Sequence, residues 1–242
     1  MLYFAATGSN LDALGAHPNI GIMTGPRAAN YVPIRTGRPW ASDCDVLSRH
    51  GYDEAAYFKH LVRMQPFHAT CRFVVVPDLP GNGEATHAMF PYLARELADS
   101  GFPLAYVLQD GCETLDFPLG CDVAFLGGTD PWREAWGATL LARARAEGLG
   151  THVGRVNSQR RVQALALTAC DGADGTYVGF RGLKRGISEI GQWLNAASAP
   201  LFAPEDVRPL VTPERAVRPA APRPTEGLDA QPLFAEEWRR SA

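Results

Sequence analysis

From Cys71 onward, the hydrophobic positions of the chain follow two alternating periods. Short apolar runs rich in β-branched residues alternate with longer segments whose apolar residues recur at helical spacing. Glycine, proline and aspartate stand at most of the junctions. This is the pattern of repeated βα units. It predicts strands at 72–76, 104–108, 122–126, 151–156 and near 175–178, and helices at 84–100, 130–147 and 159–168.

The residues before Cys71 show the same pattern less clearly. It predicts strands at 2–6, 20–23 and near Trp40, a helix at 53–64, and a last helix late in the chain at 187–197. Strands that are apolar on both faces belong in a parallel sheet covered by helices. Roughly seven or eight βα units in about 200 residues fit a compact (β/α)8 barrel of the TIM type better than an open doubly wound sheet. We therefore expect an α/β barrel domain over residues 1–200.

The composition changes in the segment 201–242. Seven prolines, interleaved with arginine and alanine, fall in the last forty residues. Such a segment buries too little apolar surface to order itself, so we expect a solvated, partly disordered extension. Docking of Leu233, Phe234 and Trp238 on the barrel or on a partner is the alternative.

Charge and cysteine content exclude several classes of protein. The 242 residues carry 23 Lys and Arg against 26 Asp and Glu, a net charge of -3, which excludes a uniformly basic nucleic-acid-coating protein. The five cysteines are odd in number and form no CxxC pair, so a reducing compartment is expected. No apolar run approaches the roughly 18 residues of a membrane helix. These features predict a cytoplasmic protein without a membrane partner, in the host cytoplasm if a phage encodes it.

Polar residues and glycines gather where the predicted strands end. Carboxyl ends of barrel strands converge on one mouth, where barrel active sites are built. Several carboxylates and an amide are therefore expected around one pocket. The alternative is that these residues are ordinary caps and turns. The residues are Asp43, Asp78, Gln109 with Asp110, Gly127 with Gly128, and Asp174.

Four segments in a fixed order carry a family resemblance: VVVPDLPGN, VLQDG, FLGGTDPW and the run THVGRVNSQRRVQALALTACDGADGT. Together they resemble the queuine/archaeosine tRNA-guanine transglycosylase family over roughly residues 40–178. More narrowly, they resemble its DNA-acting branch, the 7-deazaguanine DNA transglycosylases (DpdA-like). The resemblance implies a (β/α)8 barrel that exchanges a guanine base in DNA for a 7-deazaguanine such as preQ0. The reaction leaves the backbone intact and passes through a covalent aspartyl-glycosyl intermediate.

The resemblance also implies roles for the carboxylates. Asp174 of DGAD becomes the nucleophile, with Asp171 as its supporting neighbour. Asp43 of WASD becomes the general acid/base, a role that Asp45 could share. Attack on an anomeric carbon needs one carboxylate to hold the glycosyl group and a second carboxyl group to manage the proton on the departing and arriving bases.

Base recognition falls on three further positions by the same resemblance. Asp78 and Gln109 hydrogen-bond the purine edge, and the pair Gly127–Gly128 closes over the base. In chemical terms, Asp78 accepts from N1–H and the exocyclic amine, while Gln109 or the Gly128 amide donates to O6. His152, at a strand end beside the expected pocket, is a further substrate-binding candidate, although a structural histidine is the commoner case.

Two departures from the family pattern change the picture. No zinc element follows Cys170, so no metal or other cofactor is expected. The glycine-glycine-aromatic run usual after the first aspartate is replaced by Cys44-Asp45-Val46-Leu47, which removes the aromatic residue expected to stack on the base. Because C1′ is shielded in a stacked duplex, the enzyme is expected to flip the target nucleotide or act on single strands.

Residues 143–185 hold eight Arg and Lys against three acids. A phosphate-binding ridge beside the mouth would bind DNA by counterion release; solvated helix charge is the alternative. The residues we assign to nucleic-acid binding are Arg155, Arg160, Arg161, Arg181, Lys184 and Arg185.

Two other motifs lack a residue that their usual function needs. Gly81-Asn82-Gly83 lacks the third glycine of a dinucleotide turn, and Asp43-x-Asp45 has no HxH pair to complete a metal site. A tRNA-acting enzyme, a non-catalytic purine- or DNA-binding barrel of a modification complex, and hydrolytic base removal stay open as functions. So do a homodimer and a partner in such a complex.

Overall fold

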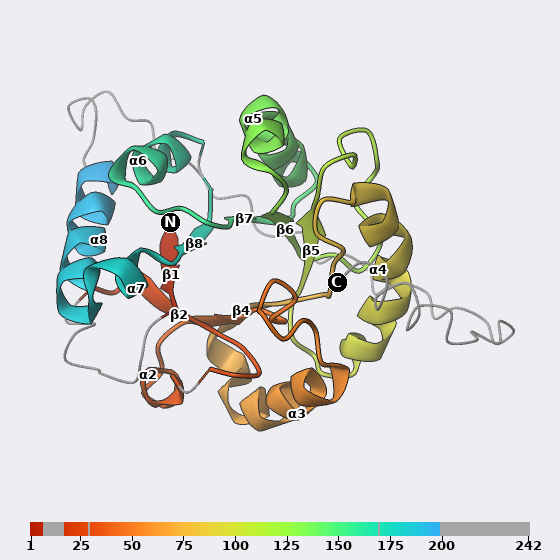
Figure 1. Cartoon of the computed structure of the whole chain (residues 1–242), viewed down its shortest axis with the longest axis horizontal. Helices are drawn as coiled ribbons and strands as arrows, with labels where there is room; N and C mark the ends of the chain where they lie inside the picture. Colours follow the sequence, from red (N-terminus) through yellow and green to blue (C-terminus); the bar gives the residue numbers. More distant parts are fainter. Residues whose placement is uncertain (7–16, 29, 169, 199–242) are drawn as a thin grey trace, which may run out of the picture.

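The computed structural model describes residues 1–6, 17–28, 30–168 and 170–198. In this part of the chain, eight parallel strands pair in chain order and the last closes onto the first, forming a barrel (Figure 1). The predicted (β/α)8 class is confirmed. The strands are β1 (Leu2–Ala5), β2 (Ile20–Thr24), β3 (Trp40–Ser42), β4 (Cys71–Val75), β5 (Leu104–Leu108), β6 (Val123–Leu126), β7 (Gly150–Val153) and β8 (Gly172–Gly175).

Helices surround the strands (Figure 1). Asp53, Asn82 and Ser158 begin three of them by accepting a hydrogen bond from the backbone N–H three residues on. Residues 109–122, between β5 and β6, form no helix. The helices of the described residues are α2 (Tyr31–Arg35), α3 (Glu54–Met64), the 3₁₀ helix η1 (Gln65–Thr70), α4 (Gly83–Ala98), α5 (Asp130–Ala146), α6 (Gln159–Leu167), α7 (Tyr177–Arg181) and α8 (Leu183–Ser198).

Aromatic side chains fill the inside of the barrel. Phe4 on β1 packs against Phe73 on β4 with ring centroids 5.9 Å apart, and Phe73 packs against Phe125 on β6 at the same 5.9 Å. These strands are not neighbours in the barrel, so the rings meet across its interior. The interior is therefore a packed core, as expected for this fold. The polar residues of the candidate site lie above it, at the strand ends.

Two strand predictions need correction. The strand expected near 175–178 lies three residues earlier, as β8, and Tyr177–Arg181 forms α7 instead. Gly172 to Gly175 carry little hydrophobic signal, whereas Tyr177 and Val178 are typical of strands, so the pattern pointed downstream. The strand expected to reach Val156 ends at Val153, since Arg155 adopts a left-handed backbone conformation with φ +58°.

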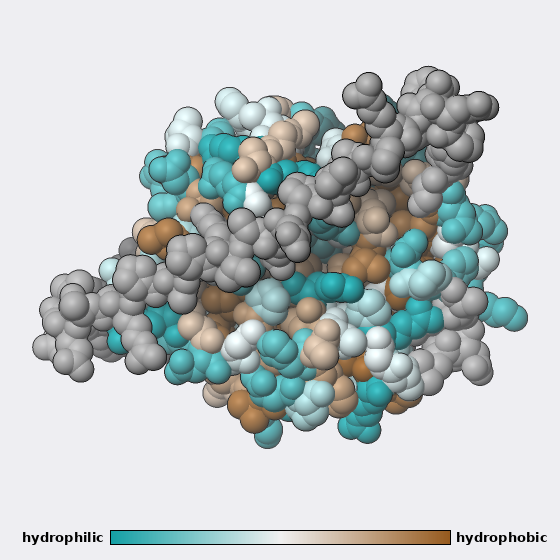
Figure 2. Space-filling view, turned by 180° about the vertical axis from the view of Figure 1, so that it is seen from behind, coloured by the Kyte–Doolittle hydropathy of each residue, from teal (hydrophilic) through white to brown (hydrophobic). Residues whose placement is uncertain are grey.

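The described surface is mixed in hydropathy. Figure 2 shows hydrophilic and hydrophobic residues interspersed over the described part of one face. Within the described residues, no helix is long and apolar enough to cross a membrane. All five cysteines are buried free thiols. The segment 201–242, with its expected extension, lies outside the described residues.

Candidate active site

One pocket opens at the carboxyl ends of the strands, with a cavity volume of about 240 Å³. Its walls come from β2 and β8 and from residues near or just after the carboxyl ends of β3, β4, β5, β6 and β7. The six main site residues predicted from the sequence all line it. They are Asp43, Asp78, Gln109, Gly127, Gly128 and Asp174.

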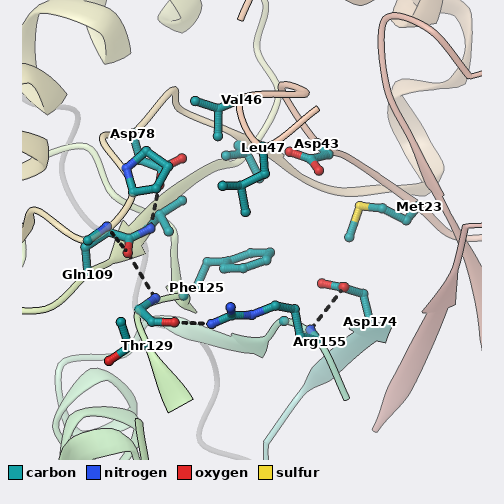
Figure 3. Close-up of a pocket in the computed structure, with 17 residues that line it drawn as sticks. Met23, Asp43, Val46, Leu47, Asp78, Gln109, Phe125, Thr129, Arg155 and Asp174 are labelled. Atoms are coloured by element: carbon teal, nitrogen blue, oxygen red, sulfur yellow. Dashed lines mark hydrogen bonds between the residues drawn. The ribbon is translucent and has the colours of Figure 1, made fainter. Parts of the chain in front are cut away.

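Asp78 and Gln109 form one side of the pocket (Figure 3). Gln109 Nε2 donates to Asp78 Oδ2 at 2.6 Å, and Gln109 Oε1 accepts from the backbone N–H groups of Gly81 and Gly128, both at 3.0 Å. The Gly128 amide is thus already used, so the expectation that it donates to a bound base is not supported. The second Nε2 hydrogen of Gln109 is left as a donor, beside the carboxylate of Asp78 as an acceptor.

The two glycines let the chain pass close to this pair. Gly128 has φ +64°, and a Cβ there would lie 2.4 Å from Trp132 Cε3. A Cβ on Gly127 would lie 2.7 Å from Val107 Cγ1 and 3.0 Å from Gln109 Nε2. Side chains at these positions would therefore displace the wall that holds Gln109.

Two acids of the pocket have raised pKa values. Burial, followed by the negative charges of Asp174 and Asp45, raises the pKa of Asp43 to about 6. Burial raises the pKa of Asp78 to about 7, against the lowering effect of its hydrogen bond from Gln109. Near neutral pH both carboxyl groups can therefore gain or lose a proton, which suits acid/base work.

Asp174 stands opposite, on β8 (Figure 3). Its Oδ2 lies 2.8 Å from His152 Nε2, within hydrogen-bond distance, and its Oδ1 lies 3.4 Å from the backbone nitrogen of Arg155. His152 itself is only 1% exposed and does not line the pocket. Of the two alternatives for His152, a substrate-binding or a structural histidine, this position favours the structural one, because His152 reaches the pocket only through Asp174.

The role expected for Asp171, as the supporting neighbour of Asp174, also needs correction. It precedes β8, whereas Asp174 lies towards the carboxyl end of that strand, about 10 Å away at strand spacing. Its Oδ2 accepts from the backbone N–H and the hydroxyl of Thr151 at 2.9 and 3.0 Å, and its Oδ1 lies 3.4 Å from Arg145 Nη1. Asp171 thus ties β7 to β8 at the far end of the barrel and does not support the nucleophile.

Asp45 also has a structural place. Its backbone has φ +63°, and its carboxylate accepts from the Arg27 N–H at 3.2 Å and pairs with the Arg27 guanidinium at 3.5 Å. It does not line the pocket. Its proximity still raises the pKa of Asp43, so Asp45 acts on the site through its charge.

Apolar side chains that the sequence pattern did not single out also form the pocket walls. Met23, Val46, Leu47 and Phe125 line the pocket around the polar groups (Figure 3). Phe125 supplies an aromatic ring from β6, where the sequence had suggested that the stacking residue was missing. Strand alternation contained this signal, because Phe125 and Gly127 are two residues apart and face the same way.

The predicted basic residues are not one group. Arg155 lines the pocket, and its guanidinium donates to the Gly128 carbonyl. Arg161 pairs with Asp130 at 3.3 Å. Arg181 and Arg185 share Glu189, at 3.3 and 2.9 Å. The remaining two, Arg160 on α6 and Lys184 on α8, are exposed.

Among the described residues, no group of three or more His, Cys, Asp and Glu is placed to hold a metal ion. Comparison with protein-family models and with curated proteins finds no match to this chain.

Proposed function

We propose that this protein is a transglycosylase that exchanges a guanine in DNA for a 7-deazaguanine base such as preQ0. The observation that carries the proposal is the two-sided pocket. The hydrogen-bonded pair Asp78 and Gln109 faces one side of the cavity, while Asp174 and Asp43 flank the other. The resemblance of the sequence motifs to 7-deazaguanine DNA transglycosylases supports DNA as the polymer.

The first side suits the edge of guanine. An ionised Asp78 accepts from N1–H and the exocyclic amine, and the unused Nε2 hydrogen of Gln109 donates to O6. A 7-deazaguanine has the same edge, so one arrangement serves both the departing and the arriving base. Phe125 and the apolar pair Val46–Leu47 provide surfaces against which the ring can pack.

The second side suits glycosyl transfer. A carboxylate oxygen of Asp174 attacks C1′, the C1′–N9 bond breaks, and its electron pair stays on N9 of guanine, which takes a proton from Asp43. The incoming base then returns its N9 proton to Asp43 and attacks C1′, which releases the Asp174 carboxylate. Protons and electrons balance over the two half-reactions. A pKa of about 6 lets Asp43 serve in both directions.

The test is base exchange by the purified protein. Wild type, Asp174→Asn and Asp171→Asn are incubated with DNA or tRNA and a labelled 7-deazaguanine base, and the polymer is digested for nucleoside mass spectrometry. We expect label in DNA with the wild type, a loss of at least 10³-fold with Asp174→Asn, and retained exchange with Asp171→Asn. The Asp171 variant is the matched control, because it changes the same residue type just beyond the opposite end of the same strand.

Other outcomes would redirect the proposal. Label in tRNA alone would indicate a tRNA-acting enzyme, and abasic sites without label would indicate hydrolytic base removal. Nucleic-acid binding without either product would contradict enzymatic activity of this chain and favour a purine- or DNA-binding subunit.

A further inference from the structure

Beneath Asp174 lies a histidine that the exchange reaction described above does not use. We infer that His152 is a positioning residue, which holds the Asp174 carboxylate as a neutral Nε2–H donor and does not carry a proton during the reaction. The inference rests on the proposed function, in which Asp174 is the nucleophile. If the inference holds, a residue buried inside the barrel positions the nucleophile at the pocket.

The contact is direct and closed to solvent. His152 Nε2 lies 2.8 Å from Asp174 Oδ2, and His152 is 1% exposed. Because His152 does not line the pocket, a substrate meets only the carboxylate. The hydrogen bond uses Oδ2, while among the described residues Oδ1 has only the 3.4 Å contact with the Arg155 backbone nitrogen. Oδ1 is therefore the oxygen left for attack on C1′.

Three phenylalanines surround the imidazole. The ring centroids of Phe4, Phe73 and Phe125 lie 5.6, 4.8 and 4.6 Å from that of His152. Phe125 comes from β6, the strand next to β7, while Phe4 and Phe73 come from β1 and β4, which do not pair with β7. The imidazole is therefore enclosed from several sides of the barrel interior. Next to it, a Cβ on Gly172 would lie 2.7 Å from His152 Nδ1. The absence of a side chain there makes room for this ring.

The surroundings of the imidazole favour a proton on Nε2 over one on Nδ1. His152 Nδ1 is buried and has no hydrogen-bond partner among the described residues. A proton on Nδ1 would be a buried donor without an acceptor, which is unfavourable. An unprotonated Nδ1 avoids this cost and leaves the proton on Nε2, where Asp174 accepts it. The same reasoning disfavours the imidazolium, which would carry a proton on both nitrogens.

The groups around His152 and in the pocket indicate that Asp43, and not His152, transfers the proton. Asp174 on β8 is the titratable group that faces the imidazole, and the neighbours from β1, β4 and β6 are phenylalanines. Asp43, after β3, lines the pocket and interacts with the charge of Asp174. A proton on its way to the departing base therefore has a carrier in the pocket, while the imidazole stays behind the nucleophile.

Kinetics of two variants test the positioning role. His152→Phe keeps an aromatic ring in an aromatic cage but removes the donor, and His152→Gln places an amide N–H close to the position of Nε2. We expect kcat for base exchange to fall by about 10–100-fold in the Phe variant with KM for the base little changed. The Gln variant should recover to within a few-fold of wild type. Unchanged kcat in the Phe variant would overturn the inference.

The pH profile separates positioning from packing. Without the donor, the Asp174 carboxylate lies against an apolar ring and its charged form is less stable. The acid limb of kcat, measured at a saturating concentration of base so that ionisation of Asp78 does not set it, should therefore move to higher pH in the Phe variant and return in the Gln variant. A role in packing alone would lower activity or thermal stability without moving this limb.

A measurement independent of activity reads the tautomer. Nitrogen-15 NMR of the histidine-labelled full chain distinguishes a protonated Nε2 with a bare Nδ1 from the other two forms. We expect the Nε2–H form at neutral pH; an Nδ1–H tautomer or an imidazolium would overturn the inference. A wild type without base exchange would contradict the proposed function, and the NMR result would still decide the state of His152.

Discussion

At the scale of the residue, Asp78 couples the stability of the fold to pH. Burial raises its pKa from 3.8 in a model peptide to about 7 in the folded protein. A folded-state pKa above the unfolded value means that the folded state binds the proton more tightly. The contribution of Asp78 to stability is therefore fully present below about pH 4 and is lost as pH rises towards 7.

Above pH 7 the buried Asp78 is ionised, which lowers the stability of the fold. Replacement of Asp78 by asparagine should remove this destabilisation. At 1.36 kcal/mol for each pKa unit, a shift of about three units corresponds to roughly 4 kcal/mol as an upper value. Chemical denaturation should show Asp78→Asn more stable than wild type at pH 8 and nearly equal to it at pH 4. The exposed Asp116→Asn serves as the control. Equal stabilisation of Asp78→Asn at both pH values would contradict the assignment.

The same residue predicts the pH dependence of base binding. Only the ionised Asp78 can accept from both N1–H and the exocyclic amine of a guanine-like base. Titration calorimetry with a 7-deazaguanine base should therefore show affinity that rises from pH 6 to pH 8 and levels off above the pKa of about 7. Asp78→Asn should bind weakly at every pH. A flat profile in the wild type would argue against this edge of the pocket as the recognition side.

At the scale of the element, the predictable parts were those that repeat. The strands β5 and β6 are continuous apolar runs, and β4 is apolar apart from Arg72. These three strands, and the helices after β4 and β6, were found from periodicity. The strand β8, which reads GADG, is the exception. Its pairing with β1 and β7 comes from barrel closure, a tertiary constraint that no local pattern contains.

The position of β8 bears on what could be predicted for Asp174, Asp171 and His152. Asp174 was expected among the residues at the pocket, and it lines the pocket; its role as the nucleophile stays a prediction. Asp171 was misassigned because its distance from Asp174 depends on the strand that joins them. His152 lies inside the barrel for the same kind of reason, since strand alternation directs it inward among rings that come from distant parts of the sequence.

The loop from β6 to α5 allows an element-scale test. Gly128 and Gly148 both have positive φ, +64° and +77°, but a Cβ on Gly128 would meet Trp132 at 2.4 Å whereas a Cβ on Gly148 has open space. Gly148→Ala should cost about 1–2 kcal/mol from backbone strain alone. Gly128→Ala should cost more, since Trp132 has to move.

Activity should separate the same two variants. Gly128 donates its N–H to Gln109, so displacement of the loop also disturbs the recognition pair. We expect base exchange to fall at least tenfold in Gly128→Ala and to stay near wild type in Gly148→Ala, when both are assayed at a temperature where they remain folded. Equal losses of activity in the two variants would show that the positions of Trp132 and Gln109 do not depend on the absence of a side chain at Gly128.

At the scale of the whole molecule, the charge that could hold a polymer is local. The net charge is -3, so attraction to DNA has to come from a basic face rather than from the protein as a whole. Within the predicted basic set, Glu189 already compensates Arg181 and Arg185 on α7 and α8. Arg160 on α6 is exposed, and no ion pair is found for it among the described residues. The fold thus divides a basic segment of sequence into compensated and uncompensated parts.

The salt dependence of DNA binding should reveal this division. If Arg160 contacts a phosphate, Arg160→Gln weakens binding equally across sequences and lowers the slope of log K against log salt by about one. Arg185→Gln removes the same charge from a pair with Glu189, so we expect a smaller change in slope. Fluorescence anisotropy with single-stranded DNA over a range of salt concentrations measures both variants. An equal loss of slope for Arg185→Gln would show that Glu189 releases Arg185 when DNA binds, and it would extend the nucleic-acid face from α6 to α8.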